Sequence, residues 1–371
     1  MKQLRRKLGC LAIGLLLCLT ACAPAGDQPV NTEVHEEENV AAITLSTEIE
    51  ELEEGLSAVR YQGDYGFDSF LEQGGAASDQ EVVQYLAENL LSGLDLGDIL
   101  GSIFGCSTLA VESPEGHALF GRNFDWQSCE ALVVESHPES GYASLSTVNM
   151  DFITQNVGDG PVAAALNIHE IRTLAALYAP LDGMNEAGLA VSVNMIQDNA
   201  QIDQNTGKPG LTTTTAIRLL LDRAANVVVD EALALLAQYD LHGSLGMMVQ
   251  FALADASGRS VAVEYVNNEM VVTETPVLTN FYLAPGEKQG IGTEQSHQRY
   301  DILLEALERS PQMDALQVRD ALDSVSKDNF GEFESTEWSI VMDLTEGSAT
   351  YYHREDYVHG YKFQLERSND Q

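Results

Sequence analysis

The spacing of apolar residues in the first third of the chain predicts helices. Between residues 49 and 59 they recur at intervals of three and four, at Ile49, Leu52, Leu56 and Val59. Thr47 with Glu50 fits a capping box at the start of such a helix. A second helix is expected to begin at Ser78, with Glu81 as its box partner, and to bury Val82, Leu86 and Leu90. The pattern therefore predicts a small helical segment over residues 43–105.

After residue 105 short apolar runs predict strands. The runs 106–111 and 117–122 are joined by Ser113-Pro114-Glu115-Gly116, a sequence suited to a turn, so we expect a hairpin there. Further strands are expected at 131–135, 188–194, 247–254, 260–266, 270–273, 338–344 and 349–353. Helical spacing returns at 213–225, 230–239 and 298–307. Two groups of antiparallel strands with helices between and after them predict a layered α+β fold.

The first residues have the pattern of an export signal. Four cations at positions 2–7 precede the uncharged run 8–19, which is shorter than the ~20 apolar residues of a membrane helix. Leu19-Thr20-Ala21-Cys22 resembles the bacterial lipobox, whose cysteine carries a diacylglycerol; an ordinary secretory signal cut after Ala21 or Ala23 is the alternative. We expect a lipoprotein signal peptide over 1–21, lipidation of Cys22, and a location at the bacterial cell surface or otherwise outside the cytoplasm, anchored to the membrane by the lipid.

Residues 22–42 differ in composition from the rest of the chain. They hold an acidic run at 36–38 and show no apolar periodicity, which predicts a solvated tether between lipid and domain. The whole chain of 371 residues is acidic, with 57 Asp and Glu against 19 Lys and Arg and a net charge of -38. This balance argues against a nucleic-acid partner, because phosphate binding needs a basic face. The chain also lacks CxxC, HExxH and the glycine-rich nucleotide motifs.

Cys106 is the candidate for chemistry. Gly105 before it leaves an unhindered carbonyl, and Arg122 and Asp125 lie one predicted hairpin away. A cation near the thiol favours the thiolate, and an anion is able to hold an ammonium group. Judged on these residues alone, an inert core thiol and a structural Arg122–Asp125 ion pair remain the alternatives.

Several stretches extend this observation over residues 106 to about 355. In chain order they are Cys106-Ser107-Thr108 with Gly121-Arg122-Asn123-Phe124-Asp125, Asp182-Gly183-Met184-Asn185-Glu186-Ala187-Gly188-Leu189 ending at Val193-Asn194, Val277-Leu278-Thr279-Asn280, Ser296-His297-Gln298-Arg299-Tyr300, and Thr336-Glu337-Trp338-Ser339-Ile340-Val341. Together they resemble the linear amide C-N hydrolases related to bile-salt hydrolase, penicillin V acylase, acid ceramidase and the isopenicillin-type acyltransferase.

The resemblance implies an N-terminal-nucleophile hydrolase of the cysteine type. Its fold is a four-layer αββα sandwich, in which two antiparallel sheets lie between helical layers. The precursor of such an enzyme cuts itself at Gly105–Cys106, so residues 43–105 become a helical propeptide or small subunit and residues 106–371 the catalytic domain. No cofactor is implied, and an oligomer is compatible with the sequence.

The resemblance also implies a role for each matched residue. Cys106 becomes the nucleophile that forms an acyl-thioester, and its freed α-amine, with a pKa of about 7.7 to 8.0, acts as the base. Arg122 stabilises the thiolate, and Asp125 fixes the α-amine. The backbone N–H of Asn194 and the side-chain amide of Asn280 form the oxyanion hole, and Arg299 is a second arginine near the nucleophile. Judged without the resemblance, the two asparagines are better interpreted as strand-end caps.

The resemblance implies that the substrate is a small N-acyl amide, and bile salts, ceramides, penicillins and N-acyl amino acids all fit it. Trp126 is a candidate for shaping the acyl pocket. An acyltransferase that passes the acyl group to an amine is the alternative among enzymes, and a binding lipoprotein without catalysis is the alternative outside them. Cys129 has no matched role and is expected to be a free or core thiol. The pairs His169–Glu170 and His353–Glu355 supply too few ligands for a metal site.

Overall fold

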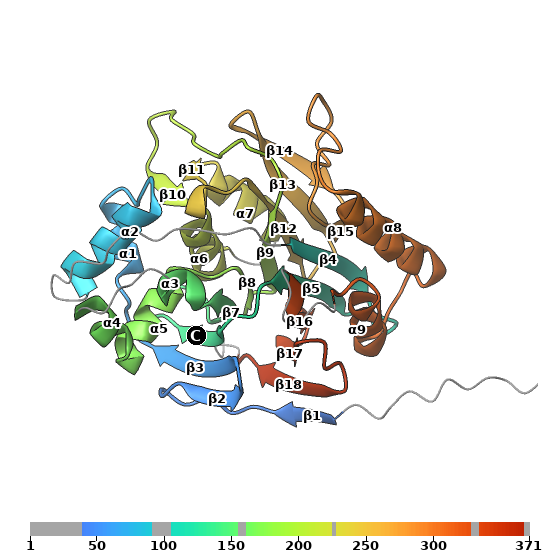
Figure 1. Cartoon of the computed structure of the whole chain (residues 1–371), viewed down its shortest axis with the longest axis horizontal. Coiled ribbons are helices and arrows are strands. Elements are labelled where there is room, and N and C mark those ends of the chain that lie inside the picture. The colour runs from blue at the N-terminus through green and yellow to red at the C-terminus, as the bar shows by residue number, and fades with distance from the viewer. Residues whose placement is uncertain (1–38, 91–104, 155–160, 225–227, 328–333, 367–371) are drawn as a thin grey trace, which may run out of the picture. The chain divides into compact units, whose positions relative to one another are not determined.

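The computed structural model describes residues 39–90, 105–154, 161–224, 228–327 and 334–366. The predicted signal peptide, Cys22 and most of the tether lie outside these ranges. Two β-sheets lie face to face, with helices on both outer sides (Figure 1). Within the described ranges, no helix has both the length and the apolar character needed to cross a membrane.

One sheet has seven strands in the order β1-β18-β17-β16-β5-β4-β15. Their bounds are β1 (Asn39–Ala42), β4 (Gly105–Glu112), β5 (Ala118–Trp126), β15 (Val277–Leu278), β16 (Ser335–Asp343), β17 (Ser348–His353) and β18 (His359–Gln364). All neighbours in this sheet are antiparallel except β1 and β18, which run parallel.

The other sheet has nine strands in the order β14-β13-β12-β9-β8-β7-β6-β3-β2. Their bounds are β2 (Glu50–Glu53), β3 (Leu56–Gln62), β6 (Ala131–His137), β7 (Ser144–Asn149), β8 (Asp182–Asn185), β9 (Leu189–Met195), β12 (Val249–Asp255), β13 (Ser260–Val266) and β14 (Glu269–Glu274). Here β3 and β6 form the parallel pair. A separate parallel pair joins β10 (Gly210–Thr212) to β11 (Asp240–His242).

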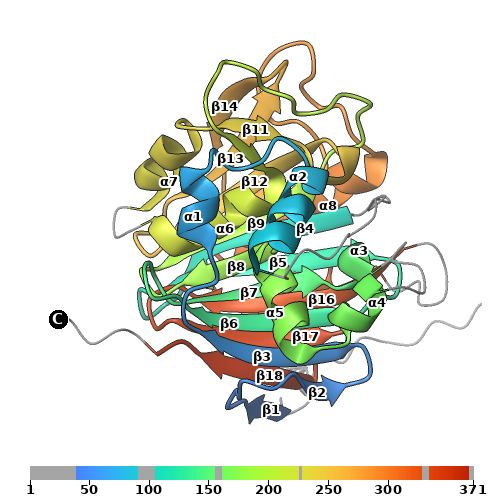
Figure 2. The same ribbon diagram turned by 90° about the vertical axis from the view of Figure 1, so that its left-hand side faces the viewer.

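Helices cover the outer face of each sheet. On the nine-stranded sheet lie α3 (Asp151–Thr154), α4 (Pro161–Leu166), α5 (His169–Leu177), α6 (Thr213–Arg223) and α7 (Val228–Leu236), with α1 (Phe67–Glu72) and α2 (Asp79–Tyr85) beside them (Figure 2). On the seven-stranded sheet lie α8 (Glu294–Arg309) and α9 (Ala315–Asp323). A π-helical turn continues α2 over Leu86–Leu90, and a 3-10 turn spans Ser244–Gly246. The predicted layered α+β arrangement is confirmed.

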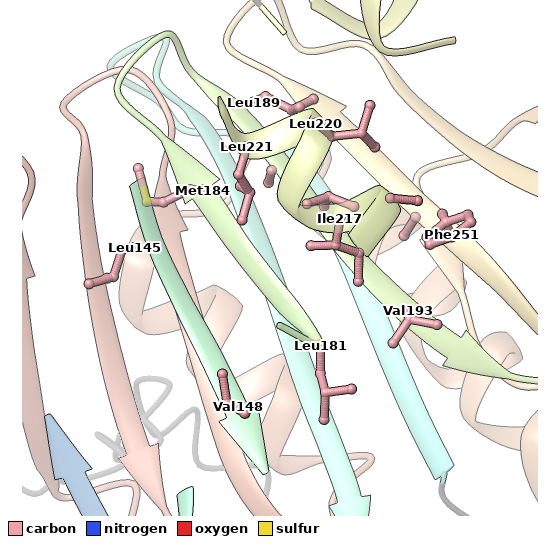
Figure 3. Packing of buried hydrophobic residues seen from close by; sticks show 14 of the residues in the cluster. Leu145, Val148, Leu181, Met184, Leu189, Val193, Ile217, Leu220, Leu221 and Phe251 are labelled. Atoms are coloured by element: carbon pink, nitrogen blue, oxygen red, sulfur yellow. The ribbon is translucent and has the colours of Figure 1, made fainter. Parts of the chain in front are cut away.

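Helix α6 illustrates how the core is built. Thr212 and Thr215 form a capping box at its start, which satisfies backbone N–H groups that have no partner within the helix. Its apolar face, with Ile217, Leu220 and Leu221, is fully buried against the nine-stranded sheet (Figure 3). Burying each such side chain contributes about 1.5–3 kcal/mol, so this face fixes the helix on the sheet.

The predicted helix over residues 49–59 is wrong. Residues 50–53 and 56–62 form the hairpin β2–β3, and Gly55 makes its turn with a φ of 91°. Leu56, Ala58 and Val59 are fully buried because β3 pairs with β6, more than seventy residues later in the chain. The local spacing suited a helix, but this long-range pairing decides the structure.

The second predicted helix is confirmed at α2. The Ser78 side chain accepts a hydrogen bond from the backbone N–H of Glu81, as expected for its N-cap. Val82 and Leu86 are buried as predicted. The predicted helical segment 43–105 is thus partly helical, and it also adds β2–β3 to the nine-stranded sheet. The prediction of a solvated tether over 22–42 is wrong for residues 39–42, because they form strand β1, which pairs with β18.

Candidate active site

The hairpin β4–β5 positions the candidate nucleophile, as the sequence predicts. Its register places Gly105 opposite Asp125, Cys106 opposite Phe124, and Thr108 opposite Arg122. Side chains alternate along a strand, so Arg122 and Asp125, three residues apart, point to opposite faces of the sheet. Arg122 faces the nine-stranded sheet, whereas Asp125 faces α8. The alternative of a structural Arg122–Asp125 ion pair is therefore wrong.

The Cys106 thiol is fully buried in the uncut chain. The Arg122 Nη2 atom lies 3.6 Å from Sγ. Burial raises the pKa of Cys106 to about 12, although the Arg122 charge opposes the rise. Burial of the Cys106 side chain therefore favours the neutral thiol over the thiolate in this structure.

Arg122 is held by a partner that the sequence analysis did not assign. Its Nε lies 2.6 Å from Oδ2 of Asp182, and its Nη1 donates to the Val193 carbonyl at 2.9 Å. The Trp338 indole N–H donates to the same Asp182 oxygen at 3.0 Å. Asp182 is the first residue of one of the matched stretches, and this position in the motif was the sequence feature that indicated a functional role. Arg122 and Asp182 are both fully buried, so the pair fixes the guanidinium beside the thiol.

Asp125 is bound on both of its oxygens. Arg299 lies 2.8 Å from Oδ2, and the Thr336 hydroxyl donates to Oδ1 at 2.8 Å. Lys327 stands 3.6 Å from Oδ2. Arg299 also donates to the carbonyl of Cys106 at 3.3 Å, so one guanidinium links Asp125 to the nucleophile's own backbone.

Asn280 contacts the residue that would become the new N-terminus. Its Oδ1 accepts hydrogen bonds from the Cys106 N–H at 2.9 Å and from Arg299 at 2.8 Å. Its Nδ2 donates to the Met195 carbonyl at 2.7 Å and has a second hydrogen for another acceptor. The Ser296 hydroxyl, at the start of α8, accepts from the Asn280 N–H at 2.6 Å and fixes the backbone there.

Asn194 lies on β9 beside Arg122. Its Oδ1 accepts from the Ser192 hydroxyl at 3.0 Å and from Arg122 at 3.5 Å. These contacts complete one connected network of the predicted catalytic residues, which are Cys106, Arg122, Asp125, Asn194, Asn280 and Arg299. Residues from four separate matched stretches thus meet at one point between the sheets and α8.

The remaining candidates lie in other surroundings. Trp126 is buried edge-on to Phe152, with ring centroids 4.9 Å apart, and its role in an acyl pocket stays a prediction. Cys129 is a free, buried thiol, as expected. Among the described residues, no group of three or more His, Cys, Asp or Glu side chains is arranged to hold a metal ion.

Comparison with known proteins gives a match by family and by fold. Residues 106–282 match the family described as linear amide C-N hydrolases, choloylglycine hydrolase family. A variant of conjugated bile acid hydrolase from Clostridium perfringens is 18% identical, with a TM-score of 0.53 over 71% of this chain and 93% of that chain. Penicillin V acylase from Agrobacterium tumefaciens is 16% identical, with a TM-score of 0.45 over 70% of this chain and 86% of that one. No curated protein matches the chain by sequence.

Proposed function

The chain belongs, through residues 106–282, to the choloylglycine hydrolase family of linear amide C-N hydrolases, and from this premise we propose that it is an autoprocessed cysteine amidase. Its substrates are N-acyl amides of the bile-salt, N-acyl amino acid, ceramide or penicillin type. The single observation that carries the proposal is the convergence of Arg122, Asn280 and Arg299 on Cys106, directly after Gly105.

Self-cleavage comes first in the proposed sequence of events. Cys106 Sγ bonds to the carbonyl carbon of Gly105, the C–N bond between the two residues breaks, and the thiol proton ends on the Cys106 nitrogen. Water then hydrolyses the thioester, which leaves a carboxylate on Gly105 and restores the thiol. The new α-amine has an ordinary pKa near 7.7 to 8.0, so it serves as a base at neutral pH where the intact amide does not.

Substrate hydrolysis then uses the same atoms. The thiolate attacks the substrate carbonyl, the α-amine passes the proton to the departing amine, and water cleaves the acyl-thioester. Arg122, 3.6 Å from Sγ, stabilises the thiolate, and Asp125 holds the α-amine in place. The free hydrogen of Asn280 Nδ2 and the backbone N–H of Asn194 stabilise the oxyanion, for which one such donor is typically worth ~10²–10³ in rate.

The segment before the cut remains as a small subunit. Its strands β1 and β3 pair with β18 and β6 of the catalytic part, and cutting one peptide bond leaves these pairings in place. A lipid on Cys22 then anchors both pieces at the bacterial cell surface.

Intact mass measurement tests the proposal. We expect wild-type protein to split between residues 105 and 106, Cys106→Ala to remain one chain, and Cys129→Ala, which removes the other described thiol, to split normally. A panel of N-acyl amides incubated with the split enzyme identifies the acyl chain and the leaving amine. A single uncut chain in wild type as well as in Cys106→Ala contradicts self-processing.

The two alternatives give different products. An acyltransferase converts an added amine to its acylated form at the expense of the free acid, since the amine replaces water at the thioester. A binding lipoprotein without catalysis retains substrate but releases neither product.

A further inference from the structure

Three charged side chains surround Gly105. A methyl group at its Cα would lie 2.6 Å from Oε1 of Glu334, 2.8 Å from Nζ of Lys327 and 3.1 Å from Oδ2 of Asp125. Such distances are shorter than van der Waals contact, so any larger residue at position 105 would displace the ends of these three side chains from the backbone. Neither Lys327 nor Glu334 belongs to the matched stretches, and the catalytic roles proposed above do not use them.

Lys327 is buried at this position. Its side chain is 4% exposed, its Nζ lies 2.6 Å from Oε2 of Glu334, and the Glu334 side chain is 18% exposed. The backbone of Lys327 is fixed as well, because its N–H donates to the Thr336 hydroxyl at 2.8 Å. Thr336 in turn binds Asp125. A buried lysine is costly unless it is paired, so this ammonium group is held in place by specific partners.

The charges at the junction balance in the uncut chain. Arg122 pairs with Asp182, Arg299 with Asp125, and Lys327 with Glu334. Cutting between residues 105 and 106 adds one ammonium group and one carboxylate. Asp125 lies near the new α-ammonium group. The new carboxylate on Gly105 is negatively charged and buried, so it needs a cation close to Gly105.

We propose that Lys327 is a catalytic residue for self-cleavage, whose ammonium group stabilises the negative charge that develops on the Gly105 carbonyl oxygen and then holds the new Gly105 carboxylate. This proposal rests on the self-processing proposed above. A Cβ position lies about 2.5 Å from the carbonyl carbon of its own residue, and Nζ lies 2.8 Å from that position at Gly105, so Nζ is at most about 5.3 Å from the scissile carbon. The ion pair with Glu334 keeps Lys327 in place and balances its charge before the bond breaks.

Time-resolved cleavage of the full chain tests this role. Wild type, Cys106→Ala, Lys327→Met, Lys327→Arg and Lys327→His are made by cell-free synthesis, and the uncut fraction is followed by intact mass. The exposed Lys208→Met is the matched control for loss of a lysine charge. We expect Lys327→Met to cut about 100-fold more slowly than wild type, as for the loss of one oxyanion donor. Lys327→Arg should restore part of the rate.

The variant Lys327→His tests whether cleavage requires a positive charge at position 327 or only a side chain that fills this position. Imidazole loses its charge near pH 6.5 when unperturbed and at higher pH beside carboxylates, so the cleavage rate of Lys327→His relative to wild type should fall as the pH rises from about 5.5 to about 8.5. Asp125 and Glu334 face this position, and both favour the charged imidazole. A pH-independent ratio, or wild-type cleavage by Lys327→Met, overturns the role of Lys327 and leaves self-processing intact. An uncut wild-type chain overturns both proposals.

Discussion

Replacing Phe70 by alanine tests how the segment before Cys106 is held to the rest of the protein. Phe70 lies on α1 and is fully buried. Its ring centroid lies 5.1 Å from that of Tyr85 in the same segment, and 5.6 Å from that of Tyr178, which comes directly after α5 on the catalytic side. The side chain therefore contributes to the contact between the two pieces that the cut would produce.

The burial of the Phe70 side chain sets the expected loss of association free energy. Truncating a fully buried Phe to Ala costs about 3–5 kcal/mol, because apolar contacts are lost and a cavity is left. At 1.4 kcal/mol for each factor of ten, this weakens the association of the two pieces about 140- to 4,000-fold. Glu72→Ala, on the exposed side of the same helix, removes no buried contact and should leave association unchanged.

The assay measures release of the small piece from split protein that is immobilised through a C-terminal tag. Wild type and Glu72→Ala should retain the piece through dilute washing, whereas Phe70→Ala should lose it at lower urea concentration. If Phe70→Ala retains the piece as firmly as wild type, the aromatic contacts do not hold the subunit. If the wild-type piece is released at once in buffer, the proposal of a retained small subunit is wrong.

Two further predictions concern buried charge. Asp182→Asn leaves the fully buried Arg122 without its counter-charge, so we expect a loss of about 3–5 kcal/mol in the free energy of unfolding; an unchanged urea midpoint would contradict this. Burial and the Arg354 charge lower the pKa of His353 from 6.5 to about 4. The unfolded chain then binds more protons than the fold between these pH values, so stability should fall by up to about 3 kcal/mol as the pH drops through the interval. In urea unfolding at several pH values, the free energy of unfolding of His353→Gln should depend less on pH than that of wild type. An equally steep dependence in the variant would refute the role of His353.

Local sequence patterns predicted much of the catalytic part. The β4–β5 hairpin is predicted by its turn residues, and the capped helix α6 by its apolar spacing, because turns and amphipathic helices depend on neighbours within a few positions. The same reasoning failed at residues 49–59, where the partner strand β6 lies far along the chain.

The candidate site shows the same division. The resemblance identified Arg122 and Asp125 as site residues, but side chains alternate along the strand, so the two point to opposite faces of the sheet. Arg122 pairs with Asp182, and Asp125 pairs with Arg299. The ion pairs of Asp182 with Arg122 and of Lys327 with Glu334 could not be predicted, because an ion pair depends on three-dimensional approach rather than on spacing in the sequence.

The sequence by itself singled out the candidate nucleophile Cys106, the Gly105–Cys106 pair and the match of residues 106–282 to the choloylglycine hydrolase family, since these depend on residue identity and local order. Only the tertiary structure decided which charges pair across the two sheets, that the Cys106 thiol is buried with a raised pKa, and that the residues before Cys106 add strands to both sheets. The physical reason is that burial and charge pairing are properties of groups brought together from distant parts of the chain.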